Sequence, residues 1–337
     1  MMTSTQAMKL AKKYAPIFVQ KISNEWTVAD QIAPVDYPVP DAQGRLLDPA
    51  THEIINPGRI ENVVQNPDLI HKTADQAIIP PKVYFSVCET STHYFIIYAV
   101  YHVLDWWKRY APQDLYNYIR DMLDEHVHDM EGALFVITRE PFDLIDGVVT
   151  IAHNHFYLYT QPMIITGGNS DPKPRKEQLR VAKFNETIDG NIWLDKDTQR
   201  VKLYVESHGH GIKGDYKGWG SSDEIWYYSP EGQSIARPNL SYTLENIFKP
   251  DGLWHHRFNK KVFMQNKEGK WAFSYKKEDG QLGAGAANPP WSWNDVNDTS
   301  PLGEIATDPA HFIIRYAQGW GPVSTQYVYN PYTGVEV

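Results

Sequence analysis

The pattern of apolar and polar positions along the chain indicates a protein built mainly from β-strands. The longest apolar segment, residues 83–103, is rich in Tyr, Phe, Ile and Val on both faces, as expected of one buried strand or a pair of strands. Shorter strand-like segments cover residues 132–138, 147–160, 200–206, 224–228, 270–275 and 311–316. Turn-rich segments separate them, and this spacing is typical of an antiparallel β-sandwich or jelly roll with long loops.

A few short helices complete the predicted fold. Residues 5–15 place Ala7, Leu10, Ala11 and Tyr14 at helical spacing before Pro16, and residues 112–123 carry a second apolar stripe. Residues 33–58 are rich in Pro, Asp and Gly and are expected to be irregular. Because no repeat and no linker interrupts the pattern, we expect a single domain over residues 1–337. Residues 1–80 would pack on it as a helix and an irregular covering segment.

Composition and charge exclude several classes of protein. Of the 337 residues 42% are hydrophobic, which is enough for a sizeable core, and the net charge of -9 without a basic stripe argues against a nucleic-acid partner. Cys88 is the only cysteine, so an intramolecular disulfide and a thiolate zinc site are excluded. We see no signal peptide and no apolar run of transmembrane length. The expectation is a cytoplasmic protein, with peripheral membrane contact and non-classical secretion left open.

Histidine pairs are the most unusual feature of the sequence. Six of the 13 histidines form three His-x-His pairs, which are His126/His128, His153/His155 and His208/His210. In a strand, residues two apart point to the same face, so each pair can present two imidazoles side by side. Imidazole is also the commonest metal ligand, and these pairs therefore direct attention to a metal site.

The first pair continues into two acidic residues. Asp129 and Glu131 share one face of a strand, and His128 lies on the opposite face. His126 can join the two carboxylates if the chain enters the strand through a loop or bulge. Two carboxylates and one imidazole suit Mg²⁺, Mn²⁺ or Ca²⁺, and Zn²⁺ is a further option. The alternative is a strand entrance with solvated charges.

Three segments resemble a known group of proteins. They are Tyr94-Phe95-Ile96-Ile97-Tyr98-Ala99 followed by Asp105-Trp106, then Glu125-His126-Val127-His128-Asp129-Met130-Glu131-Gly132, then Glu206-Ser207-His208-Gly209-His210-Gly211. Together they resemble a divergent group of bacterial and fungal proteins, loosely related to the vacuolar-protein-sorting-type family and to the necrosis-inducing toxin-like proteins. In the toxin-like proteins an aromatic strand ending in Asp is followed by a Gly-His-Arg-His-Asp-Trp-Glu segment and a Ser-x-His-Gly motif.

The resemblance implies a β-sandwich that holds one divalent cation. The implied ligands are Asp105, His126, Asp129 and Glu131, with His208 nearby. The sequence departs from the toxin pattern at Met130, which replaces a Trp, at Glu125, which replaces a Gly, and through residues 106–125, which separate Asp105 from His126. The cysteines and secretion signal typical of the toxins are also missing. These departures affect the expectation of a host-killing role more than that of a cation.

The remaining histidines are candidates for the lining of a cavity. His210 and His208 follow a predicted strand and alternate with Gly209 and Gly211, which suggests backbone close to a ligand or a tight turn. The second histidine pair, His153 and His155, shares one face of a predicted strand with Tyr157. These side chains would line the same cavity, or they would form a polar and aromatic face of the sheet.

These observations predict a metal-dependent enzyme, hydrolytic in type, that acts on a small molecule, lipid or glycan. The metal would polarise the substrate or activate water, and His128 or His208 would transfer the proton. The alternative is a non-enzymatic toxin-like or lectin-like protein whose cation shapes a loop that binds a lipid or glycan. A third option is a purely structural cation.

Overall fold

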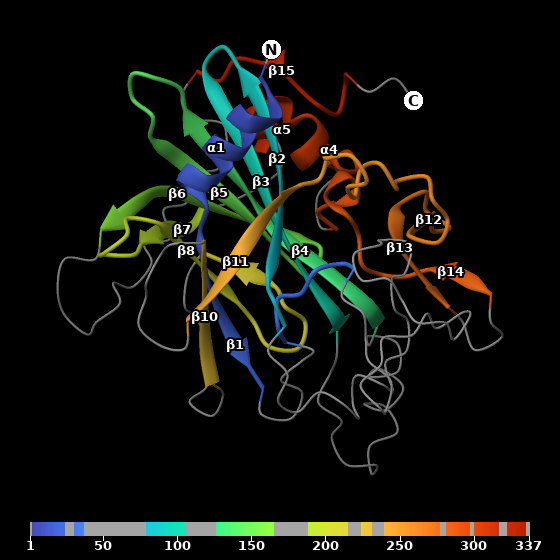
Figure 1. Cartoon of the computed structure of the whole chain (residues 1–337). Helices are drawn as coiled ribbons and strands as arrows, with labels where there is room; N and C mark the ends of the chain where they lie inside the picture. Colours follow the sequence, from blue (N-terminus) through green and yellow to red (C-terminus); the bar gives the residue numbers. More distant parts are fainter. Residues whose placement is uncertain are drawn as a thin grey trace.

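The computed structural model describes residues 2–23, 30–36, 79–105, 126–164, 188–214, 224–230, 239–276, 281–296, 300–316 and 322–334 (Figure 1). Its central feature is a closed barrel of ten strands. These strands are β1 (Ile17–Ile22), β2 (Lys82–Thr90), β3 (His93–Asp105), β4 (His126–Thr138), β5 (Ile145–Ala152), β6 (His155–Ile164), β7 (Ile188–Leu194), β8 (Val201–Val205), β10 (Glu224–Pro230) and β11 (Asn239–Asn246).

The barrel closes because β1 pairs on both of its edges. The strand order is β1-β10-β11-β2-β3-β4-β5-β6-β7-β8, and β1 then pairs with β8 in parallel, with Phe18 opposite Leu203. Three further pairs, β10–β11, β11–β2 and β6–β7, are also parallel. The predicted antiparallel β-sandwich or jelly roll is therefore wrong. Strand periodicity reports which residues share a face, but it carries no information about which distant strand closes a sheet.

Two apolar cores lie on the two faces of the barrel wall. One core joins side chains from strands all round the ring, including Phe18, Phe85, Tyr98, Phe135 and Tyr228, so it fills the barrel interior. The other core covers the outer face of β2 to β6. It contains Leu134, Trp293 and Phe312 and packs under the C-terminal segments seen beside the barrel in Figure 1. Both faces of the central strands are thus buried, which explains the two-sided apolar character of residues 83–103.

The helix expected at residues 5–15 is confirmed as α1 (Ser4–Tyr14). A capping box between Thr3 and Gln6 begins it, and its buried face is Ala7, Ala11 and Tyr14. The Tyr98 hydroxyl, which belongs to the interior core, donates to the carbonyl of Ala11 at 2.8 Å. Because the same core includes the buried face of the helix, α1 covers one end of the barrel. Buried polar side chains lie at the opposite end of the barrel.

The C-terminal part of the described chain packs against the outer core. It comprises a sheet of β12 (Phe263–Gln265), β13 (Trp271–Lys276) and β14 (Leu282–Ala284), then η2 (Pro290–Ser292), α4 (Glu304–Thr307), α5 (Pro309–Tyr316) and β15 (Tyr327–Tyr329), which pairs with β2. Residues 311–316 were expected as a strand, and this is wrong because they form α5. Pro309 begins the helix, and Phe312, Ile313 and Tyr316 lie on its buried face.

Other predicted elements fall within the barrel wall. Residues 83–103 form the β2–β3 hairpin, and residues 147–160 form the β5–β6 hairpin with a turn at His153 and Asn154. The helix expected at residues 112–123, and most of the irregular segment at residues 33–58, lie outside the described residues. None of the helices in the described part of the chain is long and apolar enough to span a bilayer.

Candidate functional site

A group of buried polar side chains lies at the end of the barrel opposite α1. We call it the mouth cluster, and its members are Gln20, Asp30, His102, Asp129, Glu131 and His210, each at most 8% exposed. His102 and Asp129 are directly opposite one another in the β3–β4 register, and Glu131 is opposite Val100. Val100 belongs to the interior core, so the acidic side chains of β4 point into the barrel.

His210 lies between two carboxylates. Its Nδ1 is 2.9 Å from Asp129 Oδ2 and its Nε2 is 3.1 Å from Asp30 Oδ1. Asp30 is held in turn by backbone N–H groups, since Ser23 and His208 donate to it at 2.7 and 2.8 Å. The loop after β8, the segment after β1 and the start of β4 therefore meet at this one imidazole.

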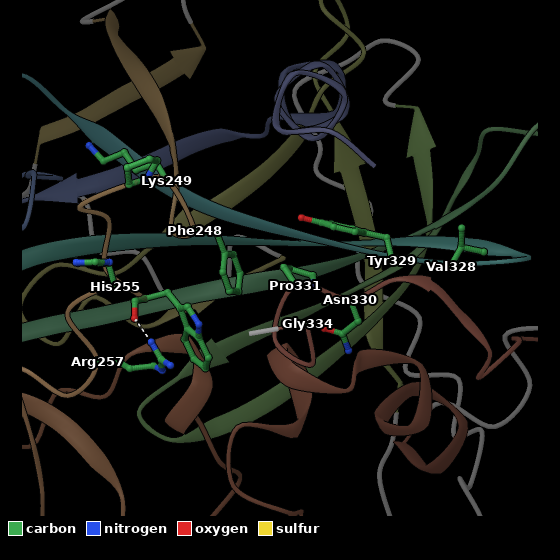
Figure 2. A pocket seen from close by; sticks show the side chains of 11 residues that line it. Phe248, Lys249, His255, Arg257, Val328, Tyr329, Asn330, Pro331 and Gly334 are labelled. Atoms are coloured by element: carbon green, nitrogen blue, oxygen red, sulfur yellow. Dashed lines mark hydrogen bonds between the residues drawn. The ribbon is translucent and has the colours of Figure 1, made fainter. Parts of the chain in front are cut away.

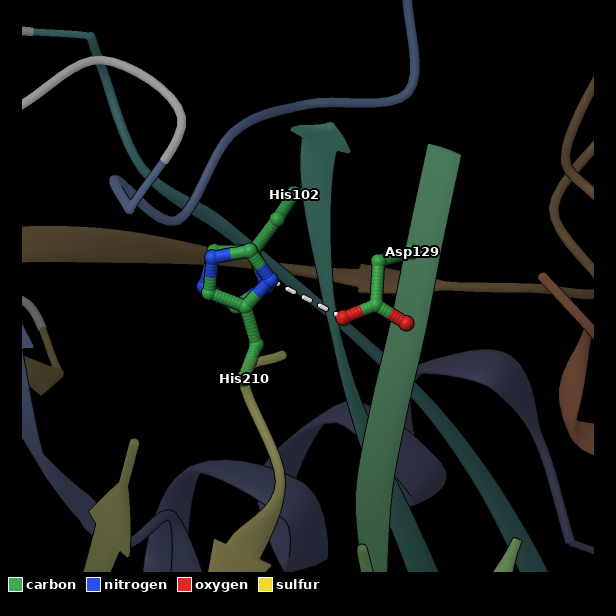
Figure 3. Close-up of side chains that lie close together, drawn as sticks. All are labelled: His102, Asp129 and His210. Atoms are coloured by element: carbon green, nitrogen blue, oxygen red, sulfur yellow. Dashed lines mark hydrogen bonds and ion pairs between the residues drawn. The ribbon is translucent and has the colours of Figure 1, made fainter. Parts of the chain in front are cut away.

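The ring of His102 stacks on the ring of His210 (Figure 3), with 3.8 Å between ring centroids and 6° between planes. His102 Nε2 lies 3.2 Å from Gln20 Oε1, whereas its Nδ1 has no hydrogen-bond partner among the described residues. Burial, followed by the nearby charge of His210, lowers the pKa of His102 well below its usual value. Burial also acts against the charged form of His210, but the hydrogen bonds to Asp129 and Asp30 outweigh it and raise the pKa of His210 to about 10. One ring is thus neutral and the other is a cation.

Within the described residues, only one of the two carboxylate oxygens of Glu131 has a hydrogen-bond partner. Its Oε1 accepts the backbone N–H of His153 at 3.0 Å, and its Oε2 is buried with no partner in the described part of the chain. Burial raises the pKa of Glu131 well above its usual value, and the charges of Asp129 and Asp105 raise it further. Asp105 therefore lies near enough to Glu131 to interact with it electrostatically. It is also directly opposite His126 in the β3–β4 register, so residues 106–125 leave and re-enter the sheet at one point.

Three partly exposed polar residues, His153, Glu206 and Lys213, lie beside the cluster. His153 Nε2 lies 3.1 Å from Glu206 Oε2, and the Lys213 ammonium donates to Glu206 Oε1 at 2.6 Å. Burial alone would raise the pKa of Glu206, but the hydrogen bonds from His153 and Lys213 lower it to about 2. Gly209 lies against His153, because a Cβ at Gly209 would lie 2.4 Å from His153 Cε1. The glycine is thus needed for close packing on an imidazole.

The histidine pairs do not behave as plain strand residues. His128, His153, His208 and His210 all have positive φ, between 49° and 73°, a region that non-glycine residues seldom adopt. The second and third pairs lie at turns, so their two imidazoles do not point side by side as strand alternation predicts. Such backbone conformations are costly and persist where the surroundings determine them, commonly at functional sites.

His128 lies on the face of β4 opposite to Asp129 and Glu131, as strand alternation predicts. Its Nδ1 is 2.5 Å from the Tyr101 hydroxyl, its Nε2 is 3.1 Å from the carbonyl of Ser274, and its ring stacks on Phe273. These contacts connect β4 to the C-terminal sheet. The structure thus separates His128 from the mouth cluster.

The other predicted site residues lie at or near the mouth of the barrel. His208 is half-buried and its Nδ1 lies 3.0 Å from Ser207 Oγ. Tyr157 is half-buried under Lys213, while His155 lies 3.6 Å from a carboxylate oxygen of Asp295, away from the cluster contacts. The backbone of His126 begins β4, but its side chain lies outside the described part of the structure.

Sequence reasoning did not identify Gln20, Asp30 and Glu206. Gln20 and Asp30 stand alone in the sequence, and 180 positions separate Asp30 from the His210 that it contacts. No local pattern could have indicated this pair. Glu206 was recognisable, because it precedes the third histidine pair.

The mouth cluster has the composition of a metal site. Donor atoms of His102, Asp129 and His210 all lie within 4.8 Å of one another, and all three residues are buried, so this group could hold a metal ion. Glu131 Oε2, which has no hydrogen-bond partner within the described residues, adds a further oxygen donor beside this group. Mixed carboxylate and imidazole donors accommodate Mn²⁺ and Zn²⁺, and the carboxylates alone suit Mg²⁺ and Ca²⁺.

Comparisons with known proteins give weak structural similarity alone. No family model matches the sequence, and no curated protein matches it. Similar solved structures include necrosis and ethylene inducing protein 2 from the causal agent of cocoa's witches' broom disease, at 19% identity over 62% of this chain and 68% of that one, with a TM-score of 0.29. The non-toxic HaNLP3 protein matches at 14% identity over 73% and 75% of the chains, with a TM-score of 0.31.

A third similar structure, NLPPya in complex with glucosamine, matches at 16% identity over 61% of this chain and 65% of that one, with a TM-score of 0.26. The similar structures are thus toxin-fold proteins of the necrosis-inducing type, which agrees with that part of the resemblance. Nothing in the comparisons supports the vacuolar-protein-sorting part. Similarity at these values carries no inference about activity or ligand.

Proposed function

We propose that the mouth cluster binds one divalent cation and that the protein is a cation-dependent, non-enzymatic binding protein for a glycan or a lipid headgroup. The observation that carries the proposal is an excess of buried carboxyl groups over buried basic groups in the mouth cluster. Asp30, Asp129 and Glu131 are each at most 6% exposed, and His210 is the cation that Asp30 and Asp129 share. Buried carboxylates are costly unless a positive charge compensates them, and a divalent cation would do so.

The donor set follows from the atoms left without partners. Asp129 and Glu131 would hold the cation, with His102 Nδ1 as the nearest imidazole donor and Asp105 and His126 as further proposed ligands. A bound cation would present a positive charge to ligand oxygens at the barrel mouth. His153, Glu206 and Lys213 lie partly exposed beside it and would donate to, and accept from, the hydroxyl groups of a sugar or headgroup.

A cation titration tests the proposal. Metal-stripped protein is melted with increasing Ca²⁺, Mg²⁺, Mn²⁺ or Zn²⁺, beside Glu131→Gln and a control, Glu268→Gln, at a carboxylate that is 68% exposed. Without metal, Glu131→Gln should melt at or above the wild-type temperature, because it replaces a buried carboxyl group whose charged form is disfavoured and keeps the acceptor for His153. With saturating metal the wild type should melt several degrees higher and the variant should not follow. No cation-dependent rise, or the same rise in Glu131→Gln, would contradict the proposal.

The ligand is tested separately. Binding to immobilised glycans and to vesicles of differing headgroup is measured with and without a chelator. We expect binding that the chelator removes and that Glu131→Gln lacks. Chelator-independent binding would show that the cation does not take part in ligand recognition.

A metal-dependent hydrolase is the second candidate. One observation supports it: His153 lies beside the cluster with its Nε2 3.1 Å from Glu206 Oε2, and this imidazole would accept a proton from water that a bound cation activates. His208 is the other candidate for that role. Turnover of an ester or glycoside that is lost in both His153→Gln and Glu131→Gln, and kept in Glu268→Gln, would favour this candidate over a binding protein.

A further inference from the structure

A separate hollow of about 530 Å³ lies between the turn after β11 and the C-terminal strand β15 (Figure 2). It shares no lining residue with the mouth cluster, and its volume is in the range of small-molecule sites. Phe248, Trp254, Tyr329 and Pro331 supply apolar walls, and Lys249, His255 and Arg257 supply basic groups. This combination of rings and basic groups suggests a ligand site.

The aromatic wall is held rigidly by neighbouring rings. The centroid of Trp254 lies 5.4 Å from that of Phe248 and 5.1 Å from those of Trp291 and Tyr332, in tilted or edge-on geometry. Interlocked rings of this kind do not collapse into a hollow, because moving one would break its contacts with the others. The apolar wall is thus preformed.

The charge of the lining is the informative feature. The chain has a net charge of -9, yet no Asp or Glu lines this hollow. Lys249 is paired outside it with Glu245, at 2.8 Å. The Arg257 guanidinium has no carboxylate partner within the described ranges of the chain. A local positive site on an acidic protein favours an anionic ligand.

The orientation of Arg257 is fixed. Its guanidinium lies 4.6 Å from the Trp254 ring centroid and 4.4 Å from that of Phe258, and its Nη1 donates to the Trp254 carbonyl at 3.0 Å. Other N–H donors of the guanidinium are left for a ligand, and a fixed fork of donors matches a carboxylate.

We propose that this hollow binds a small organic acid with a flat apolar ring, its carboxylate on Arg257 and its ring against Trp254 and Phe248. Calorimetric titration with 2-naphthoate is the test, beside its uncharged analogue 2-naphthamide. Arg257→Gln removes the proposed partner, and Lys267→Gln removes one positive charge from an exposed turn outside the hollow. Val328→Glu places a negative charge at the rim, and Val296→Glu makes the same change at a position 55% exposed elsewhere.

We expect naphthoate to bind at one site and naphthamide at least tenfold more weakly. Arg257→Gln and Val328→Glu should each weaken naphthoate binding about tenfold or more, with Lys267→Gln and Val296→Glu close to the wild type. The proposal is overturned if naphthoate does not bind at millimolar concentration, if the amide binds equally well, or if each variant binds like its control. A melting curve of every variant confirms that it is folded, and the test needs no metal, so it is independent of the mouth cluster.

Discussion

The imidazole of His210 lies parallel to that of His102 at 3.8 Å, and their surroundings shift the pKa values of the two rings in opposite directions. Burial and the nearby charge of His210 lower the pKa of His102, and the hydrogen-bond partners of the two rings also differ. His210 has a carboxylate at each nitrogen, whereas His102 has the amide of Gln20 at one nitrogen and no partner among the described residues at the other. A neutral ring can stack on a cationic one at little electrostatic cost. The site thus keeps one unprotonated nitrogen available.

Asp30 is predicted to support this arrangement electrostatically, together with Asp129. Asp30→Asn removes the charge opposite His210 and should lower the free energy of unfolding by about 3 kcal/mol, because it disrupts a buried ion pair. Urea unfolding at neutral pH measures the change. Asp197→Asn, at an exposed turn, should change the same quantity by less than about 0.5 kcal/mol. An equal effect of the two substitutions would contradict the assignment.

His128 is predicted to stabilise the fold without contributing to cation binding. Tyr101→Phe removes the buried hydrogen bond to His128 and should lower the free energy of unfolding by about 1–2 kcal/mol. The cation affinity, measured by the same melting titration, should stay unchanged because Tyr101 and His128 lie on the outer face of the sheet. A weaker cation affinity in this variant would connect His128 to the mouth cluster.

Gly132 is predicted to be intolerant of any side chain. A Cβ there would lie 2.4 Å from the Tyr98 carbonyl oxygen and 2.4 Å from Cη2 of Trp293, so strand and indole would have to separate. Gly132→Ala should cost about 3 kcal/mol in the free energy of unfolding, measured in urea. Gly334→Ala, whose nearest neighbour is 3.8 Å away, is the control and should be nearly neutral.

Glu206 is predicted to contribute stability that is lost in acid. Its folded-state pKa of about 2 lies below the usual value of 4.5 for a glutamate, so the contribution is present above pH 4.5 and disappears as the pH falls towards 2. The partly exposed pair with Lys213 limits the effect to about 1 kcal/mol. Urea unfolding at pH 5 and pH 2.5 should show a steeper loss for the wild type than for Glu206→Gln. Parallel losses would exclude this role.

The sequence predicted which side chains at the start of β4 share a face, but it did not predict the barrel around them. Strand alternation placed Asp129 and Glu131 on one face and His128 on the other, since a period of two is a local property of an extended chain. The orientation of the second and third histidine pairs was predicted wrongly. A spacing of two residues does not reveal the positive φ at His153 and His208. Asp30 was missed because its partner lies on a distant segment. Barrel closure was missed for the same reason, since β1 pairs with β8 through contacts between remote positions.

The closing strand has a consequence for how the chain folds. β1 carries Phe18, whose neighbours are Leu203 on β8 and Tyr228 on β10, so the first barrel strand in the described sequence pairs with two strands that follow it at a long distance along the chain. Contacts of such high contact order form slowly, because a long loop must close before they are gained. Until then β8 and β10 remain open sheet edges, which are templates for intermolecular pairing. Aggregation during refolding should therefore depend on protein concentration more steeply than it does in a meander of similar size.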